Sequence, residues 1–94
     1  GHCTYVPGRG NQWILCDTYP DKERNQHLYL LHQPDRRQVP LGAFRLTPEY
    51  AGEWRCDLHP RCNRAGTLAC VDSPHAGGGR QVHVVELRRS LGEA

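Results

Sequence analysis

The chain has 94 residues, a formal net charge of +2 and a hydrophobic fraction of 37%. This length fits one domain that buries only about 60–70% of its unfolded surface, so covalent links are an expected supplement to a small core. The charge is too small to indicate a partner such as nucleic acid, whose binding domains usually carry a strongly basic face. No apolar run approaches the roughly 20 residues of a membrane-spanning helix, so we expect no membrane insertion by this segment.

The first part of the chain predicts two strands. A glycine-rich turn over residues 6–11 leads into the apolar run Trp13-Ile-Leu-Cys16, in which we expect Ile14 and Cys16 to point inward together. A polar loop with loop-favouring residues follows over 17–25. Residues 27–33 then fit a strand with Leu30 inward and with Tyr29 and Leu31 outward. The competing prediction is a helix over 21–31, which is rich in good helix formers.

The middle of the chain predicts further strands around short turns. Residues 34–37 form a turn by composition, and residues 39–46 supply the candidate core residues Leu41, Phe44 and Leu46. Trp54, Cys56 and Leu58 then alternate with three charged residues, as in a strand that is buried on one face. A third segment of strand character covers residues 80–88.

Two regions are expected to be irregular. Residues 59–79 are rich in Pro, Gly, Asn, Arg and Ser and contain Cys62 and Cys70, so they predict one long loop. Residues 90–94 have the composition of a tail or linker. The expected organisation is one domain over residues 1–94.

The segment from Leu46 through Gly52-Glu-Trp-Arg-Cys56, with Cys16 upstream and the strand at residues 82–87 downstream, resembles the corner between strands E and F of the immunoglobulin superfamily. The resemblance implies an all-β fold, an immunoglobulin-like two-sheet antiparallel sandwich with a core disulfide Cys16–Cys56 and a long F–G loop. Trp54 stands where the family has tyrosine, and strand C lacks its tryptophan. The resemblance is therefore to a divergent, compact receptor-type domain.

Five cysteines in so short a chain indicate an oxidising, extracellular environment, and an odd count leaves at least one thiol without an intrachain partner. Cys62 and Cys70 share the predicted loop and are expected to form a second disulfide. Bridges from Cys3 to either of them are the alternatives. Otherwise Cys3 is free or links to another chain, which allows an interchain disulfide or a homodimer.

A zinc-stabilised module is an alternative interpretation of the same region. Cys56, His59 and Cys62, together with Cys70 or His75, offer four ligands of suitable chemistry. Their spacing differs from the usual pair of tight Cys-x-x-Cys knuckles. We therefore expect no metal and no other cofactor.

The chain shows no catalytic pattern, because Ser73 and Ser90 are its only serines and neither lies in a nucleophile motif. We expect no enzyme but a protein-recognition domain of a secreted or cell-surface receptor, in adhesion or immunity, that binds a protein ligand or receptor. The expected C–F–G sheet face and loop consist of Tyr29, Leu31, Arg55, Asp57, His83, Val85, Arg61 and Arg64. The alternative is a structural spacer domain in a multidomain ectodomain.

Overall fold

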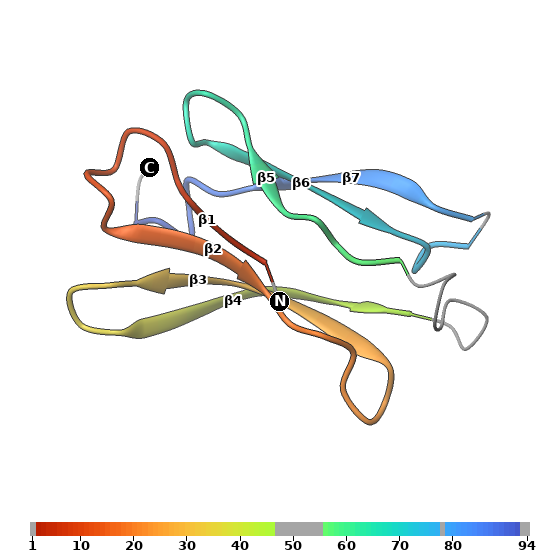
Figure 1. Cartoon of the computed structure of the whole chain (residues 1–94). Helices are drawn as coiled ribbons and strands as arrows, with labels where there is room; N and C mark the ends of the chain where they lie inside the picture. The colour runs from red at the N-terminus through yellow and green to blue at the C-terminus, as the bar shows by residue number, and fades with distance from the viewer. Residues whose placement is uncertain (1, 47–55, 78, 93–94) are drawn as a thin grey trace.

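The computed structural model describes residues 2–46, 56–77 and 79–92, which form seven strands and no helix (Figure 1). The strands are β1 (Cys3–Tyr5), β2 (Trp13–Asp17), β3 (Asn25–His32), β4 (Arg37–Arg45), β5 (Arg61–Cys62), β6 (Leu68–Ser73) and β7 (Gln81–Glu86). Within these ranges nothing has the helical length and apolar character that crossing a bilayer would require.

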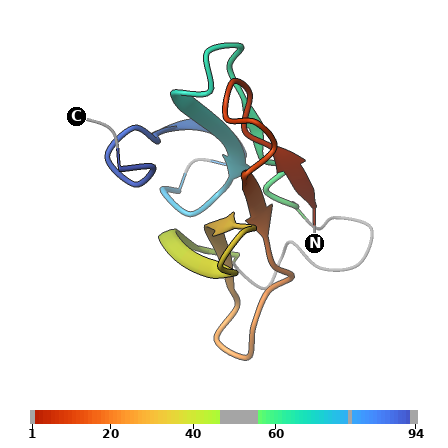
Figure 2. The same ribbon diagram turned by 90° about the vertical axis from the view of Figure 1, so that its left-hand side faces the viewer.

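The strands form two antiparallel sheets, one with the order β1-β2-β3-β4 and one with the order β5-β6-β7. Figures 1 and 2 show them as two layers that face each other. The predicted all-β fold with two antiparallel sheets is confirmed. The strand order differs from that of an immunoglobulin domain, which places strands B and C in different sheets. Here β2 and β3, at the positions of B and C, are hydrogen-bonded neighbours, so the immunoglobulin topology is not confirmed.

Tight turns explain why sequence neighbours pair. Residues 33–36 join β3 to β4, and Asp35 Oδ1 accepts hydrogen bonds from the Arg37 N–H at 3.0 Å and from His32 Nδ1 at 2.8 Å. This confirms the predicted turn at 34–37. Asp21 Oδ1 likewise accepts bonds from the backbone N–H of Glu23 and Asn25, both at 2.9 Å, ahead of β3. The helix alternative over 21–31 is wrong.

The core lies between the two sheets. Leu15 and Leu30 from the four-stranded sheet meet Ala69 and Val71 from β6, and all four are completely buried. Ordinary transfer energetics make the burial of each leucine worth about 1.5–3 kcal/mol. The remaining buried members of the core cluster are Val6, Trp13, Leu28, Leu58, Leu87 and Leu91.

A bulge in β4 explains how Leu41 and Phe44, whose spacing is odd, can both face the core. The β3–β4 register shifts between Leu28 and Tyr29, which pair with Gly42 and Pro40, so Leu41 has no partner opposite it. A bulge of this kind lets side chains on both sides of it face the same layer. Leu41 and Phe44 accordingly pack against the core although they are three residues apart, and Leu46 is 1% exposed. Leu46 is therefore buried as predicted, and Leu41 and Phe44 are partly buried at the margin of the core.

The prediction of one long loop over 59–79 is wrong, because β5 and β6 both lie inside it. Ala69, Val71 and Ser73 of β6 are completely buried, and β6 pairs with β7 along its whole length. The sequence pattern of this strand was difficult to recognise because two of its three buried side chains, Ala69 and Ser73, are small. The predicted strand at 80–88 is confirmed as β7.

Residues 47–55, which include Trp54 and Arg55, lie outside the described residues. The structure therefore describes only the last part of the strand predicted around Trp54. Residues 56–60 belong to none of the strands, so the described part of that predicted strand is wrong, although the Leu58 carbonyl accepts a 2.8 Å hydrogen bond from the Asp72 N–H of β6. Cys56 and Leu58 are buried and Asp57 is half-buried, so the predicted alternation holds in this segment.

Candidate functional site

The inner face of the four-stranded sheet is set by Trp13 and Leu15 of β2, which belong to the core cluster. Side chains alternate along a strand, so Ile14 and Cys16 lie on the opposite, outer face. The register agrees, because Cys16 is directly opposite Tyr29 and Ile14 is directly opposite Leu31. The prediction that Ile14 and Cys16 point inward is therefore wrong.

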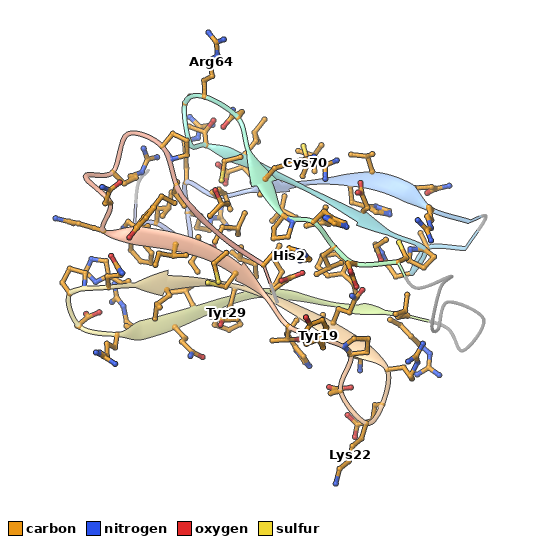
Figure 3. All side chains as sticks on the ribbon, viewed as in Figure 1. His2, Tyr19, Lys22, Tyr29, Arg64 and Cys70 are labelled. Carbon is orange, nitrogen blue, oxygen red and sulfur yellow. The ribbon has the colours of Figure 1, made fainter. Side chains whose placement is uncertain are left out.

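The predicted orientation of β3 is confirmed. Leu30 is completely buried in the core, while Tyr29 and Leu31 are half-buried on the outer face. Figure 3 shows the Tyr29 side chain on the side of the four-stranded sheet that points away from the other layer. Two of the predicted partner-binding residues thus share one surface.

The other predicted members of that face lie elsewhere. His83 and Val85 are on β7, in the second sheet, and they pair with the fully buried residues Val71 and Ala69. Residues directly opposite each other share a face, so His83 and Val85 point toward the core. Asp57 is half-buried beside the second sheet, and Arg55 is outside the described residues. The described residues therefore do not assemble the expected C–F–G face.

The structure assembles a different surface, formed by the outer face of the four-stranded sheet. One cross-strand row contains Cys3, Cys16, Tyr29 and Pro40, and the next contains Tyr5, Ile14, Leu31 and Gln38. We call these eight residues the Tyr29 face. Its aromatic and aliphatic side chains lie in adjacent rows, and Tyr5 is 48% exposed.

Two shallow depressions mark the half of the Tyr29 face nearest β4. The first has a volume of about 500 Å³ and includes Tyr29 and Pro40 in its lining. The second has a volume of about 420 Å³ and includes Leu31 and Arg36. Gln38 lines both, so the two depressions adjoin at one polar side chain. Such a surface offers apolar contact area beside a hydrogen-bonding group.

Cys16 is the cross-strand neighbour of Tyr29 on this face. Burial raises the pKa of the Tyr29 hydroxyl, and the neighbouring Cys16 raises it further. Burial also raises the pKa of Cys16 to about 12, with a smaller contribution from the neighbouring Cys3. Tyr29 therefore remains an uncharged phenol at neutral pH, suited to apolar contact and hydrogen bonding.

All five cysteines are free thiols in the structure, so the predicted Cys16–Cys56 and Cys62–Cys70 bridges are not formed. Cys16 lies on the outer face of the first sheet, whereas Cys56 precedes Leu58, which bonds to β6 in the second. Cys62 is opposite the buried Ala69, and Cys70 is opposite the exposed Arg61. Since directly opposite residues share a face, Cys62 and Cys70 point to opposite sides of their sheet.

The zinc alternative finds no support among the described residues, which contain no group of three or more His, Cys, Asp or Glu arranged to hold a metal ion. The His59 ring lies 4.8 Å from the ring of His2 instead. The His75 ring lies 4.2 Å from that of His83, and its Nδ1 is 2.8 Å from Ser73 Oγ. The proposed ligands His59 and His75 therefore belong to two separate ring contacts.

The two arginines of the predicted loop lie on the second sheet. Arg61, on β5, donates hydrogen bonds to Asp72 Oδ1 at 3.0 Å and to the His59 carbonyl at 2.8 Å. Arg64 is at the tip of the β5–β6 turn and points away from the body of the protein (Figure 3). Neither residue adjoins the Tyr29 face.

Sequence reasoning missed six members of the candidate surface, namely Cys3, Tyr5, Ile14, Cys16, Gln38 and Pro40. Their membership follows from strand pairing, because β1 and β4 flank β2 and β3. The available signal was the short turn at 33–36, which makes β4 the direct neighbour of β3. No comparable signal identifies the partner of β1.

The fold and site together define a small all-β domain of two antiparallel sheets with an aromatic and aliphatic outer face. Comparisons with protein-family models, curated proteins and solved structures find no match to the chain.

Proposed function

We propose that this domain is an extracellular protein-recognition module of a receptor or adhesion-type protein, and that it binds its partner protein through the Tyr29 face. The supporting observation is the composition of two adjacent cross-strand rows, in which Tyr5, Ile14, Tyr29 and Leu31 lie side by side. Tyrosine is enriched in protein interfaces, where a few aromatic and aliphatic anchors carry most of the binding energy.

The neighbouring loop extends the proposed surface. Tyr19 is 61% exposed in the segment between β2 and β3, and Thr18 beside it lines the larger depression. Figure 3 shows Tyr19 and Tyr29 on the side of the four-stranded sheet that points away from the other layer. Tyrosine supplies a large contact area at a low cost in side-chain entropy, which suits a residue at the margin of an interface.

The resemblance to immunoglobulin domains is a separate matter from this proposal. It rests on residues 46–56, most of which lie outside the described residues, and the observed strand order departs from it. Recognition through the Tyr29 face requires only a two-layer domain in which the outer face of one sheet is accessible to a partner. The extracellular setting is supported by the five cysteines.

In the experiment, biotinylated copies of the 94-residue chain are joined into a tetramer, and its binding to intact cells is measured. The tetramer raises the avidity for a weakly binding partner. A Tyr29→Ala/Leu31→Ala variant alters the Tyr29 face, and a Val82→Ala/Val84→Ala variant is the matched control on the second sheet. Saturable binding that the first variant loses and the control retains supports the proposal. The bound protein is then identified by chemical cross-linking and mass spectrometry.

Titration of the identified protein with monomeric chain supplies the quantitative test. Tyr29→Ala and Leu31→Ala, each made alone, should weaken the binding free energy by more than about 1 kcal/mol. This corresponds to an increase in Kd of more than about fivefold. Equal affinity of the wild-type chain and the Tyr29 face variant would exclude this surface. Equal loss in both variants would assign the effect to folding or to another face.

A further inference from the structure

Cys3 and Cys16 are directly opposite each other on the antiparallel strands β1 and β2. The His2 carbonyl accepts a 3.1 Å hydrogen bond from the Asp17 N–H, and this bond flanks the cysteine pair instead of joining it. The pair is therefore of the non-hydrogen-bonded kind, in which opposite Cα atoms are only about 4.5 Å apart. That separation lies within the range of about 4.4–6.8 Å that disulfides require.

The two side chains also share a face. Directly opposite residues of an antiparallel pair point to the same side, so the Cys3 and Cys16 sulfurs are neighbours on the outer face of the sheet. Cys3 is exposed at the edge of the sheet, whereas Cys16 is 2% exposed. Among the described cysteines, no other two are placed directly opposite each other by the strand register.

We propose that Cys3 and Cys16 form a redox modification site, at which a small-molecule disulfide such as oxidised glutathione converts the two thiols into an intrachain disulfide. This site was not expected from the sequence, which paired Cys16 with Cys56 and left Cys3 without an assigned partner. The proposal depends on strand register alone and is independent of partner binding.

The reaction proceeds in two exchange steps. The exposed Cys3 thiolate attacks one sulfur of oxidised glutathione, which breaks the glutathione S–S bond, forms a mixed disulfide and releases one glutathione thiolate. The Cys16 sulfur, after losing its proton to solvent, attacks Cys3 Sγ, forms the Cys3–Cys16 bond and releases the second glutathione thiolate. The two protein thiols are oxidised by two electrons, and one glutathione disulfide is reduced to two thiols.

The bond would tie an edge strand to its neighbour. β1 has three residues and is the outer strand of its sheet, so the described structure holds it mainly through its pairing with β2. A covalent link between residues 3 and 16 restricts the conformations of the unfolded chain. We therefore expect the melting temperature to rise by roughly 5–15 °C on oxidation.

The 94-residue chain allows an unambiguous assignment, because trypsin places each cysteine on a separate peptide. Cleavage after Arg9 and Lys22 leaves Cys3 in residues 1–9 and Cys16 in residues 10–22. The protein is equilibrated in glutathione buffers of increasing oxidised fraction, and the remaining thiols are alkylated before digestion. The expected product is peptide 1–9 linked to peptide 10–22, with an intact mass lower by about two hydrogens.

Cys3→Ser removes the exposed partner while leaving the buried Cys16 in place, and it should abolish the linked peptide and the oxidation-dependent rise in melting temperature. Cys70→Ser, in the second sheet, is the matched control and should retain both. A linkage of Cys16 to any other peptide, or of two copies of peptide 1–9, would overturn the proposal. Persistence of both thiols in fully oxidising buffer would overturn it too.

Discussion

Leu15 of β2 lies directly opposite Leu30 of β3, and both side chains are completely buried between the two sheets. This pair sets the inner face of the four-stranded sheet. Because side chains alternate along each strand, the adjacent residues Cys16 and Tyr29 must then share the outer face. The position of the candidate surface therefore follows from the leucine pair.

The leucines of β3 offer a direct test of this assignment. Leu30→Ala should lower the free energy of unfolding by about 2–5 kcal/mol, because it leaves a cavity between the sheets. Leu31→Ala, one residue further on the outer face, should cost at most about 1 kcal/mol. Urea unfolding followed by tryptophan fluorescence measures both. Equal losses would contradict the assignment of faces.

Gly66 is required by the contact between two turns. Its φ is +68°, and a Cβ atom there would lie 2.3 Å from the Pro7 carbonyl oxygen. Gly8 has a similar φ of +74° but open space around it, so it is the matched control. Gly8→Ala should cost about 1–2 kcal/mol through its backbone conformation, and Gly66→Ala should cost at least about 1 kcal/mol more. Equal costs in thermal unfolding would argue against the close approach.

His75 should make stability depend on pH. Its pKa is lowered from the ordinary 6.5, first by burial and second by the neighbouring His83. The unfolded chain therefore binds a proton at a pH where the folded chain does not, and the free energy of unfolding falls as pH decreases through the region below 6.5. Urea midpoints at several pH values should show a smaller decrease for His75→Gln than for the wild-type chain. An unchanged pH dependence in the variant would contradict this role.

The outer strand β7 of the second sheet, as described, carries exposed valines. Val82 and Val84 are 61% and 62% exposed on β7, which is the last strand of its sheet. An apolar edge strand favours edge-to-edge association, and a charge on it opposes pairing. Val84→Lys should raise the concentration at which the protein remains monomeric in light scattering, with stability changed by less than about 0.5 kcal/mol.

Gln81→Lys is the control for that measurement. Gln81 is exposed on the same strand, so this variant adds the same charge without removing a valine. A smaller effect than that of Val84→Lys is expected. Equal effects would assign the improvement to net charge rather than to the apolar edge.

The presence of several strands followed from local chemistry, although their bounds differ by up to about two residues from the predicted ones. Residues 27–33 and 80–88 alternate apolar and polar side chains or carry β-branched residues, and both proved to be strands. Asp35 stabilises the turn at 33–36 through its own carboxylate, as its residue type predicts. These signals act over a few residues and need no distant partner.

Which face of a strand is buried, and which sheet a strand joins, depended on distant contacts. Trp13-Ile-Leu-Cys16 is apolar at every position, so alternation gives no contrast, and the packing of Trp13 and Leu15 against the core decided that Cys16 faces outward. Ala69 and Ser73 bury little apolar area, so β6 exists because it pairs with β7 and covers the leucines of the opposite sheet. The sequence by itself therefore determined the strands β2, β3, β4 and β7 and the turn between β3 and β4. Only tertiary packing determined the Tyr29 face and the opposition of Cys3 and Cys16, since burial and strand pairing are properties of the whole chain.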